Sequence, residues 1–378
     1  MAEPKLLPIP PTMRSLVAPK YGPPSTYQVQ TLPTPTLTDP HSVLLRVHAA
    51  EVSTGVTQLA SGQFRLVASP HFPLPLCIGG SGTVISIGSA VTTLRPGDPV
   101  YGLYFKHGIF PPPTCGFASD YVVVPADVLL PKPEGLSFEE AAALTGSGIT
   151  AYQCFKRYFE MRGMDIKSAG AELEGKTVFV TGALSAAGSV FAQAAKNVFG
   201  ARVVATVSTG KMGLVEGELP GVVDELVDYQ RENVVRRVGK GKVDLVLNSQ
   251  WDMVGLFPLA DPGTGAVVSI ASLPGPETLR RMIGESKVPF AGLIIWLVSL
   301  AYVWYDFKLR GTNVKHDFVS GNPGNREDLE ASGEWIASGK IKAVMTVVDI
   351  NDIDAVRRGC QMVATGKGGL GKLVIKLV

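Results

Sequence analysis

The residues with the clearest chemical potential lie in a short stretch of small side chains, TGALSAAG at positions 181–188. An apolar, β-branched run precedes this stretch, and a segment with helical spacing, 189–199, follows it. Such a turn lets backbone N–H groups approach a pyrophosphate, and the N-terminus of the following helix favours negative charge. We therefore predict a dinucleotide site whose phosphates contact Ser185, Ala186 and Ala187.

The glycine pattern usual for such a site, G-x-G-x-x-G, is only partly present. Ala183, Ser185 and Gly188 stand where the three glycines would be. Two of these positions therefore carry a side chain, which weakens the match to the motif. A purely structural strand–helix–strand unit is the alternative interpretation of this stretch.

The end of the next strand bears on the choice of cofactor. The predicted strand 202–207 is followed by Ser208, Thr209, Gly210 and Lys211, without the Asp or Glu that usually binds the ribose hydroxyls of NAD. Two hydroxyl groups and an ammonium group suit the extra phosphate of NADPH instead. The sequence therefore favours NADPH over NADH. The alternative is that Lys211 is a solvated lysine in the first turn of the next helix.

Composition limits the classes of protein to consider. A chain of 378 residues is long enough for two domains with buried cores, and its formal net charge of +2 provides no basic field for nucleic acid. The four cysteines form no C-x-x-C pair, and the proline-containing N-terminus lacks the apolar core of a secretory signal. We expect a cytoplasmic protein that binds no nucleic acid.

The order of the predicted elements gives the fold class. Residues 13–124 contain apolar strand patterns separated by turns rich in proline and glycine, which predict a β-rich region. From residue 137 onward helices and strands alternate. Helices are predicted at 138–145, 149–161, 189–199, 326–337 and 352–365, and strands at 226–228, 243–247, 266–270, 344–348 and 372–377. This alternation predicts an α/β fold with a doubly wound parallel sheet.

Five segments have an order and spacing that resemble a known family: RPGDPVYG (95–102), GFASDYVVVPADVLLPKPEGLSFEEAAAL (116–144), GITAYQCF (148–155), VFVTGALSAAGSVFAQAAK (178–196) and GKGGLGKLVIKL (366–377). The chain resembles the medium-chain dehydrogenase/reductase superfamily, in its zinc-independent quinone oxidoreductase and enoyl reductase branch. The resemblance implies a β-rich, GroES-like substrate domain interrupted by a Rossmann domain. It places the substrate domain at 1–145, the nucleotide-binding domain at 146–324, and the return to the first domain at 325–378.

The chain departs from the zinc-dependent members of that family at the metal-binding positions. Where those members carry a Cys and a Gly-His-Glu triplet, this sequence has Ser53 and Cys77-Ile78-Gly79. The four closely spaced cysteines of a structural zinc site are also missing. Zinc needs about four nitrogen or sulfur ligands. We therefore predict no metal site, and hydride addition to an already polarised, conjugated acceptor.

The resemblance also implies roles for single residues. Thr150 is expected to position the nicotinamide, although a threonine there is equally suited to cap a helix N-terminus. Gln58 is expected to hydrogen-bond a substrate carbonyl or to lie at the rim of the site. Tyr229 and Asn248 follow or end strands and are expected near the cofactor. The proton-donating Tyr of fatty-acyl enoyl reductases falls near Phe64, which argues against that activity.

One uncharged stretch, VPFAGLIIWLVSLAYVWY at 288–305, belongs to no element of the family core. Its length approaches that of a membrane-spanning helix. Three interpretations are open: a buried helix or subunit interface, the apolar wall of a substrate pocket, or a peripheral contact with a membrane. A true span would split the predicted Rossmann domain across the bilayer, which disfavours it.

These features lead to two hypotheses. The first is an NADPH-dependent reductase that transfers hydride to a small, apolar, conjugated substrate (an enone, an enoyl thioester or a quinone) without metal, as a monomer or homodimer. In the second, the fold serves a non-redox biosynthetic reaction or a binding function, because the catalytic motifs at residues 53–64 are weak. Consumption of NADPH separates the two hypotheses.

Overall fold

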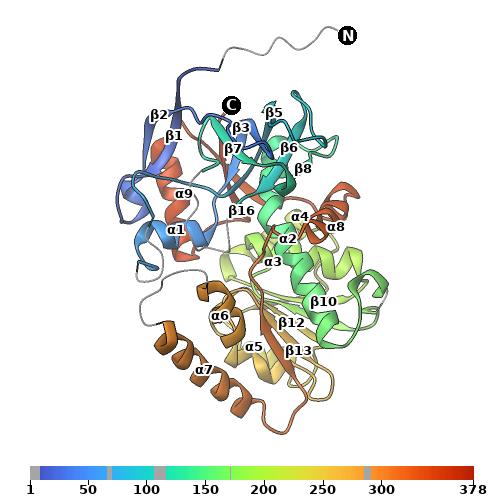
Figure 1. The fold of residues 1–378 in the computed structure, drawn as a ribbon. Coiled ribbons are helices and arrows are strands. Elements are labelled where there is room, and N and C mark those ends of the chain that lie inside the picture. Colours follow the sequence, from blue (N-terminus) through green and yellow to red (C-terminus); the bar gives the residue numbers. More distant parts are fainter. Residues whose placement is uncertain (1–8, 66–69, 106–115, 171, 285–290) are drawn as a thin grey trace. The chain divides into compact units, whose positions relative to one another are not determined.

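The structure is a computed structural model that describes residues 9–65, 70–105, 116–170, 172–284 and 291–378. The chain forms two compact units (Figure 1). Unit 1 comprises residues 1–146, 323–333 and 345–378, and unit 2 comprises 147–322 and 334–344. The division of the chain into domains at 145 and 324 stays a prediction from sequence.

Unit 2 contains a six-stranded parallel sheet in the order β11-β10-β9-β12-β13-β14. Its strands are β9 (Thr177–Val180), β10 (Arg202–Val207), β11 (Glu225–Asp228), β12 (Leu245–Asn248), β13 (Ala266–Ser269) and β14 (Lys315–Phe318). In strand numbers counted from β9, this is the order 3-2-1-4-5-6 of a doubly wound nucleotide-binding sheet. The predicted α/β fold is therefore confirmed. The order reverses between β9 and β12, whose carboxyl ends mark the place where such sheets bind ligands.

Helices and short helical turns connect these strands. The inner strands β9, β10, β12 and β13 are nearly continuous apolar runs because both faces of the sheet are covered there. β9 leads into α3, which continues as a π-helical turn. The described helical elements that lie wholly in unit 2 are η3 (Ile166–Ser168), α3 (Ala186–Gln193), η4 (Ala194–Val198), η5 (Thr209–Leu214), α4 (Val215–Glu218), α5 (Val234–Val238), η6 (Val254–Leu259), α6 (Pro276–Gly284) and α7 (Ala291–Lys308).

Unit 1 is β-rich, as predicted. Its larger sheet contains seven strands: β15 (Met345–Asp349), β16 (Lys372–Lys376), β3 (Ser42–Glu51), β5 (Gly79–Ile87), β6 (Pro99–Leu103) and β8 (Leu129–Pro131), with β7 (Tyr121–Pro125) paired to β3. A second sheet holds β2 (Gln28–Pro33), β1 (Thr12–Ala18) and β4 (Leu74–Pro75). The helical elements that lie wholly in unit 1 are η1 (Pro24–Thr26), α1 (Thr54–Ser61), η2 (Ala126–Val128) and α9 (Ile353–Thr365).

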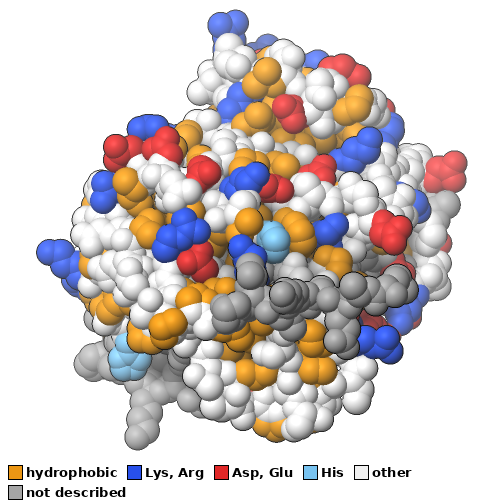
Figure 2. All heavy atoms as spheres, turned by 90° about the horizontal axis from the view of Figure 1, so that it is seen from above, with side chains coloured by type: hydrophobic (Ala, Val, Ile, Leu, Met, Phe, Trp, Pro, Cys, Tyr) orange, Lys and Arg blue, Asp and Glu red, His pale blue; other side chains and the backbone are white. Residues whose placement is uncertain are grey.

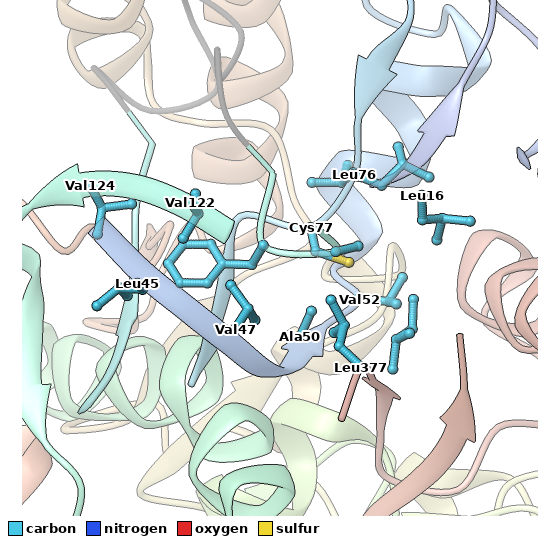
Figure 3. Close-up of a cluster of buried hydrophobic side chains, with 14 of the residues drawn as sticks. Leu16, Leu45, Val47, Ala50, Val52, Leu76, Cys77, Val122, Val124 and Leu377 are labelled. Atoms are coloured by element: carbon cyan, nitrogen blue, oxygen red, sulfur yellow. The ribbon is translucent and has the colours of Figure 1, made fainter. Parts of the chain in front are cut away.

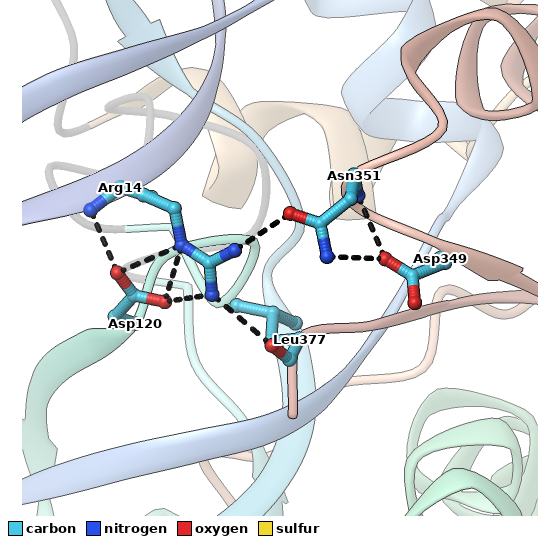
Figure 4. A network of polar contacts seen from close by, with 5 residues as sticks. All are labelled: Arg14, Asp120, Asp349, Asn351 and Leu377. Carbon is cyan, nitrogen blue, oxygen red and sulfur yellow. Dashed lines mark hydrogen bonds and ion pairs between the residues drawn. The ribbon is translucent and has the colours of Figure 1, made fainter.

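Two sets of contacts hold the C-terminal segment onto the N-terminal strands of unit 1. Leu377 belongs to the buried apolar cluster that also contains Leu16 and Val47 (Figure 3). Arg14 donates hydrogen bonds from Nη2 to Asp120 Oδ1 at 2.9 Å and to the Leu377 carbonyl at 3.2 Å (Figure 4). The C-terminal strand segment thus packs directly on the N-terminal strands within unit 1.

The helix α2 (Phe138–Met161) differs from the prediction of two helices separated near residues 146–148. A glycine inside a helix costs only about 1 kcal/mol relative to alanine. Both glycines lie close to other elements: a Cβ atom at Gly146 would meet the Glu51 carboxylate, and one at Gly148 would meet the Ile336 side chain. Tertiary contact therefore outweighs the local signal to end a helix. α2 and α8 (Arg326–Ala337) both have residues in each unit.

The uncharged stretch predicted at 288–305 forms most of α7, and residues 288–290 lie outside the described part of the chain. By length and composition, this is the one helix among the described residues that qualifies as a candidate membrane span. Only 6% of its apolar window is buried inside the structure. The interpretation as a buried core helix was therefore wrong, because periodicity cannot separate a helix that is covered on all sides from one that is covered on one side.

Candidate nucleotide-binding site

The turn between β9 and α3 has the backbone geometry of a phosphate-binding turn. Gly182 has a φ of 70°, in the left-handed region that glycine adopts without strain. Its N–H donates to Thr206 Oγ1 at 2.9 Å, which fastens the turn to the end of β10. Ser185 caps α3, since its Oγ accepts a hydrogen bond from the Gly188 N–H at 3.0 Å. The N–H groups of Ala186 and Ala187 begin the helix and have no acceptor within it, so they can bind a phosphate.

Gly188 explains how the altered motif still allows a close crossing of helix and strand. A Cβ atom at this position would lie 2.0 Å from the Gly182 carbonyl oxygen, so α3 crosses the strand end too closely for any side chain. Ala183 is buried and Ser185 is the cap, so neither side chain obstructs the helix N-terminus. The close crossing of α3 over the end of β9 thus depends on the third glycine of the motif, and this sequence has a glycine there.

Polar side chains at the carboxyl ends of β9, β12 and β13 form a connected network beside this turn. Asn248 is fully buried and donates from Nδ2 to Ser269 Oγ at 3.1 Å and to the Gln250 carbonyl at 2.6 Å, while its Oδ1 accepts from the Gln250 N–H at 2.9 Å. Thr181 Oγ1 accepts from the Ser249 N–H at 2.7 Å, and Ser249 Oγ donates to the Thr181 carbonyl at 3.0 Å. These hydrogen bonds hold the loop after β12 against the carboxyl edge of the sheet, beside the turn at 181–188.

Asn248 is therefore placed where the sequence predicted it, and its side chain acts on the neighbouring loop. The sequence analysis assigned no role to the side chains of Thr181, Ser249, Gln250 and Ser269. Each ends a buried strand or lies within two residues after one, and in parallel sheets the carboxyl ends of strands meet at one edge. That signal was present in the sequence at all four positions.

The region predicted to select the cofactor lies after β10. Ser208 precedes η5, and Lys211 lies half-buried in it, where burial lowers the pKa of its ammonium group. The structure adds a carboxylate that the sequence analysis did not place here, because it belongs to the next strand. Asp228 is buried, and its Oδ2 accepts a hydrogen bond from Thr209 Oγ1 at 2.7 Å. Tyr229 follows with an exposed ring.

Thr150 lies within α2, which begins at Phe138, so it does not cap the helix N-terminus. That alternative role is excluded because no helix break occurs before it. The segment after β14 is held against α2 beside this residue. A Cβ atom at Gly321 would lie 2.1 Å from Thr150 Oγ1, and the Gln153 side chain and the Asn322 backbone exchange two hydrogen bonds of 3.0 and 2.9 Å. Gly321 is a further residue that the sequence analysis missed.

The remaining candidate, Gln58, lies half-buried in α1 of unit 1. The sequence analysis did not predict α1, because Gly55 and the β-branched residues in TGVTQLAS are weak helix formers. Three apolar residues at helical spacing, Val56, Leu59 and Ala60, nevertheless bury one face of this helix. Packing of an apolar face thus decides the local structure.

The residues at the family's zinc-binding positions do not fit a metal ion. Cys77 is buried in the apolar cluster of unit 1, and burial raises the pKa of its thiol well above its usual value, which disfavours the thiolate that zinc binds. Cys77 stands at the glycine of the family's triplet, and the two ligand positions after it are Ile78 and Gly79, which offer no donor side chain; Ser53 offers a hydroxyl. Across the described ranges, no group of three or more His, Cys, Asp or Glu side chains is arranged to hold a metal.

Charge is not concentrated on the face of the molecule drawn in Figure 2. Lys and Arg side chains alternate there with Asp and Glu side chains. This distribution agrees with a formal net charge of +2 over 378 residues. The described side chains on that face form no continuous basic surface of the kind that binds nucleic acid.

Comparisons with known proteins place these features in context. Residues 39–134 match the family model "Alcohol dehydrogenase GroES-like domain", and residues 223–375 match "Zinc-binding dehydrogenase". A quinone oxidoreductase-like protein 2 homolog from Nematostella vectensis is 31% identical over 340 residues, which cover 88% of this chain and 81% of the relative. A solved quinone oxidoreductase from Coxiella burnetii has a TM-score of 0.71 at 22% identity and covers 97% of this chain and 100% of its own; it shows the shared fold.

Two plant proteins match over shorter stretches. A 2-methylene-furan-3-one reductase from Solanum lycopersicum is 34% identical over 50% of this chain and 45% of its own length. A chloroplastic NADPH-dependent alkenal/one oxidoreductase from Arabidopsis thaliana is 32% identical over 51% of this chain and 46% of its own length. This chain thus spans about half the length of these two curated relatives.

Proposed function

Because the chain belongs to the medium-chain dehydrogenase/reductase superfamily, in its quinone and enoyl reductase branch, we propose that it is an NADPH-dependent reductase of conjugated C=C bonds or quinones. The observation that carries this proposal is the turn at 181–188. Its close crossing at Gly188 and its two helix N–H groups at Ala186 and Ala187 match the needs of a bound pyrophosphate.

The residues present fit the cofactor. We assign the pyrophosphate to Ser185, Ala186 and Ala187, and the extra phosphate of NADPH to Ser208 and Lys211, a hydroxyl and an ammonium group at the end of β10. Asp228 lies one strand away, but Thr209 donates to its Oδ2, and the Gln230 N–H donates to its Oδ1 at 3.0 Å. Both oxygens of this carboxylate are therefore engaged within the protein.

The other predicted residues complete the site. We place Tyr229, with its exposed ring, beside the adenosine, and Thr150, held by the segment at Gly321, beside the nicotinamide. Asn248 contributes by fixing Gln250 next to the turn. When bound, NADPH supplies the hydride for the reaction.

The substrate class follows from the chemistry that the relatives' names share. The tomato relative is named for an exocyclic enone, the Arabidopsis relative for alkenals and alkenones, and the sea anemone relative for quinones. Each of these acceptors is a conjugated carbonyl compound, and hydride addition to it produces an enolate-like oxygen. Hydrogen-bond donors can stabilise that charge. We propose the Gln58 carboxamide as one such donor, with water as the source of the final proton.

We propose that no metal takes part. Relatives that oxidise plain alcohols use zinc as a Lewis acid, and the residues here at the ligand positions 53, 78 and 79 do not provide its ligands. Elemental analysis of the purified protein should give no stoichiometric zinc. Incubation with a chelator should leave both activity and the unfolding midpoint unchanged. About one zinc per chain, with loss of activity on its removal, would contradict this proposal.

The activity is tested by following NADPH absorbance with the purified chain and a panel of quinones, enones and enoyl thioesters. We expect NADPH consumption with at least one of these classes and none with a saturated ketone as the matched acceptor. Binding of NADPH without consumption across the panel would instead favour the second hypothesis, a binding or non-redox protein.

We also propose a cytoplasmic location. The cysteines Cys77, Cys154 and Cys360 are unpaired and buried in the structure, which suits a reducing compartment. Subcellular fractionation with an antibody to the native protein tests this, and recovery mainly in a secreted or organellar fraction would contradict it.

A further inference from the structure

One face of α7 exposes large apolar side chains. Seven of them are between 47% and 64% exposed: Leu293, Trp296, Leu297, Leu300, Val303, Trp304 and Phe307. We call this set the α7 stripe. Figure 1 shows α7, in orange, at the margin of unit 2 next to α6. Exposed apolar surface of this kind marks a place where a partner binds.

The opposite face of α7 is fixed to unit 2. Val298 is buried against Leu279 of α6, and Tyr302 donates a hydrogen bond from its hydroxyl to the Leu273 carbonyl at 3.1 Å. The ring of Tyr305 lies edge-on to that of Phe257, with centroids 5.9 Å apart. These contacts set the rotation of the helix about its axis, so the α7 stripe faces away from unit 2.

The positions in the stripe are symmetric about Leu300. Residues 293 and 307, 296 and 304, and 297 and 303 lie at equal distances along the helix on either side of it. An antiparallel copy of α7 related by a two-fold axis through Leu300 would therefore bring apolar side chains together at every pair. Leu300 would meet its own copy, and the other pairs would be Leu293 with Phe307, Trp296 with Trp304, and Leu297 with Val303.

The C-terminal end of the stripe is already ordered. The Lys308 ammonium lies 4.5 Å from the centroid of the Trp304 ring, and the Phe307 ring stacks on Trp304 with centroids 5.7 Å apart. Side chains held in place before association lose less entropy when they bind.

The size of the stripe matches a subunit interface. Seven side chains that are each about half exposed offer roughly 700 Å², or about 100 Å² each on average, given that an aromatic side chain covers about 150–250 Å² and an aliphatic one somewhat less. This exceeds the largest apolar patch of a typical monomer, about 300–600 Å², and approaches the roughly 800 Å² that each partner buries in a stable complex. A helix lying on a lipid surface is usually rich in Lys and Arg, whereas α7 carries one Lys and one Asp.

We propose that the α7 stripe is the interface of a homodimer in which two copies of α7 pack antiparallel across a two-fold axis at Leu300. The proposal is independent of the reductase activity. A two-fold interface is self-complementary, and the stripe contains no charge that would oppose its own copy.

The first test measures mass in solution without detergent, by sedimentation velocity over a range of concentrations. The wild type should sediment as a species of twice 40.0 kDa. Leu300→Lys sets two ammonium groups against each other at the axis and should raise the dimer dissociation constant by about 100-fold or more. Leu214→Lys is the matched control, because Leu214 is 45% exposed in unit 2 outside the stripe. It should leave the dimer intact.

The second test addresses orientation. Leu297→Lys alone and Val303→Glu alone should each dissociate the dimer. The double variant should restore it, because antiparallel packing pairs each new Lys with a new Glu, whereas parallel packing would pair like charges. Failure of the double variant to restore a dimer would overturn the antiparallel register.

Other results would overturn the interface itself. A wild type that is monomeric at every concentration would do so. So would a dimer that Leu300→Lys does not weaken, since the contact would then lie elsewhere. Flotation of the wild type, but not of Leu300→Lys, with vesicles of phosphatidylcholine and phosphatidylserine would assign the stripe to a membrane surface in its place.

Discussion

Two regions of unit 2 break the usual distribution of polar and apolar side chains, and they do so in opposite directions. At the carboxyl edge of the sheet, Thr181, Asn248 and Ser269 are polar and buried. Along α7, Trp296 and Phe307 are apolar and more than half exposed. Both arrangements cost free energy in an isolated chain, the first by desolvation and the second by contact with water.

The difference lies in where each region finds its partners. Hydrogen bonds within the chain satisfy the Asn248 amide, so the carboxyl edge is complete in one copy and can hold its shape before a ligand arrives. The α7 stripe has no such completion within unit 2. The comparison teaches that the first region works through rigidity and the second through association, and the following predictions test the two sides of this contrast.

The largest effect is expected at Gly188. In Gly188→Ala the new Cβ would lie 2.0 Å from the Gly182 carbonyl oxygen, so the backbone of the turn or of α3 must move. We expect a loss of about 3 kcal/mol in the free energy of unfolding, at the upper end for overpacking, together with loss of NADPH binding. Chemical unfolding and a fluorescence titration with NADPH measure the two effects.

Gly213→Ala is the matched control for this change. Gly213 lies in η5, and a Cβ atom added there would have no neighbouring atom within 4 Å. Its substitution should therefore change the free energy of unfolding by less than about 0.5 kcal/mol. Similar losses in the two variants would mean that the close crossing does not support the site.

The next largest effect is expected at Asn248. Asn248→Ala removes the acceptor of the Gln250 N–H and the donor to Ser269, and leaves buried polar groups without partners. We expect about 2 kcal/mol less stability and weaker NADPH binding, because the loop after β12 loses its anchor. Asn197→Ala is the control: this exposed residue makes a single 2.7 Å bond to the Lys340 carbonyl, and its loss should cost less than about 1 kcal/mol. Equal losses of stability in Asn248→Ala and Asn197→Ala would argue against a rigid carboxyl edge of the sheet.

Much of the fold could be predicted because its signals are local and strong. The buried strands of unit 2 are apolar runs closed by polar residues, and α8 and α9 carry helical spacing with acidic first turns. The small-residue turn at 181–188 likewise predicted a tight turn between β9 and α3 at the carboxyl end of the sheet. These features depend on residues that are neighbours in sequence, and the sequence therefore contains the information.

The remainder depends on contacts between distant residues. The uninterrupted α2 reflects packing of Gly146 and Gly148 against Glu51 and Ile336, which no local pattern shows. The approach of Gly321 to Thr150 is likewise a tertiary contact. The Asp228 carboxylate reaches Thr209 from a neighbouring strand, so a search confined to the end of β10 missed it.

A smaller effect is expected at the cofactor-selecting end of the carboxyl edge. Lys211→Ala should weaken NADPH binding by about 1.5 kcal/mol, or roughly tenfold, because Lys211 is half-buried and its contact with a phosphate would be partly screened. NADH binding should change little, since NADH lacks that phosphate. Ser208→Asp should weaken NADPH binding further by adding a like charge. Isothermal titration with both cofactors checks this, and equal losses for the two would place the phosphate elsewhere.

The smallest effect concerns the boundary between α7 and the sheet, where His316 of β14 lies among the rings of Phe257, Tyr302 and Tyr305. Burial lowers the pKa of His316 below its ordinary value of 6.5, although Asp306 favours the charged form. The folded protein thus takes up this proton at lower pH than the unfolded chain. Stability should be constant in this respect above about pH 6.5 and should fall as pH falls below it, by at most about 1.4 kcal/mol per pH unit.

His316→Phe isolates this contribution, because the pocket of aromatic rings can hold a further ring and the variant has no proton to bind. Urea unfolding at several pH values on either side of 6.5 should give a shallower loss of stability in acid than for the wild type. Some dependence should persist, since burial also lowers the pKa of His48 in unit 1. Parallel curves for the two proteins would show that His316 is protonated equally in both states, and that the inner face of α7 is more open to water than its burial indicates.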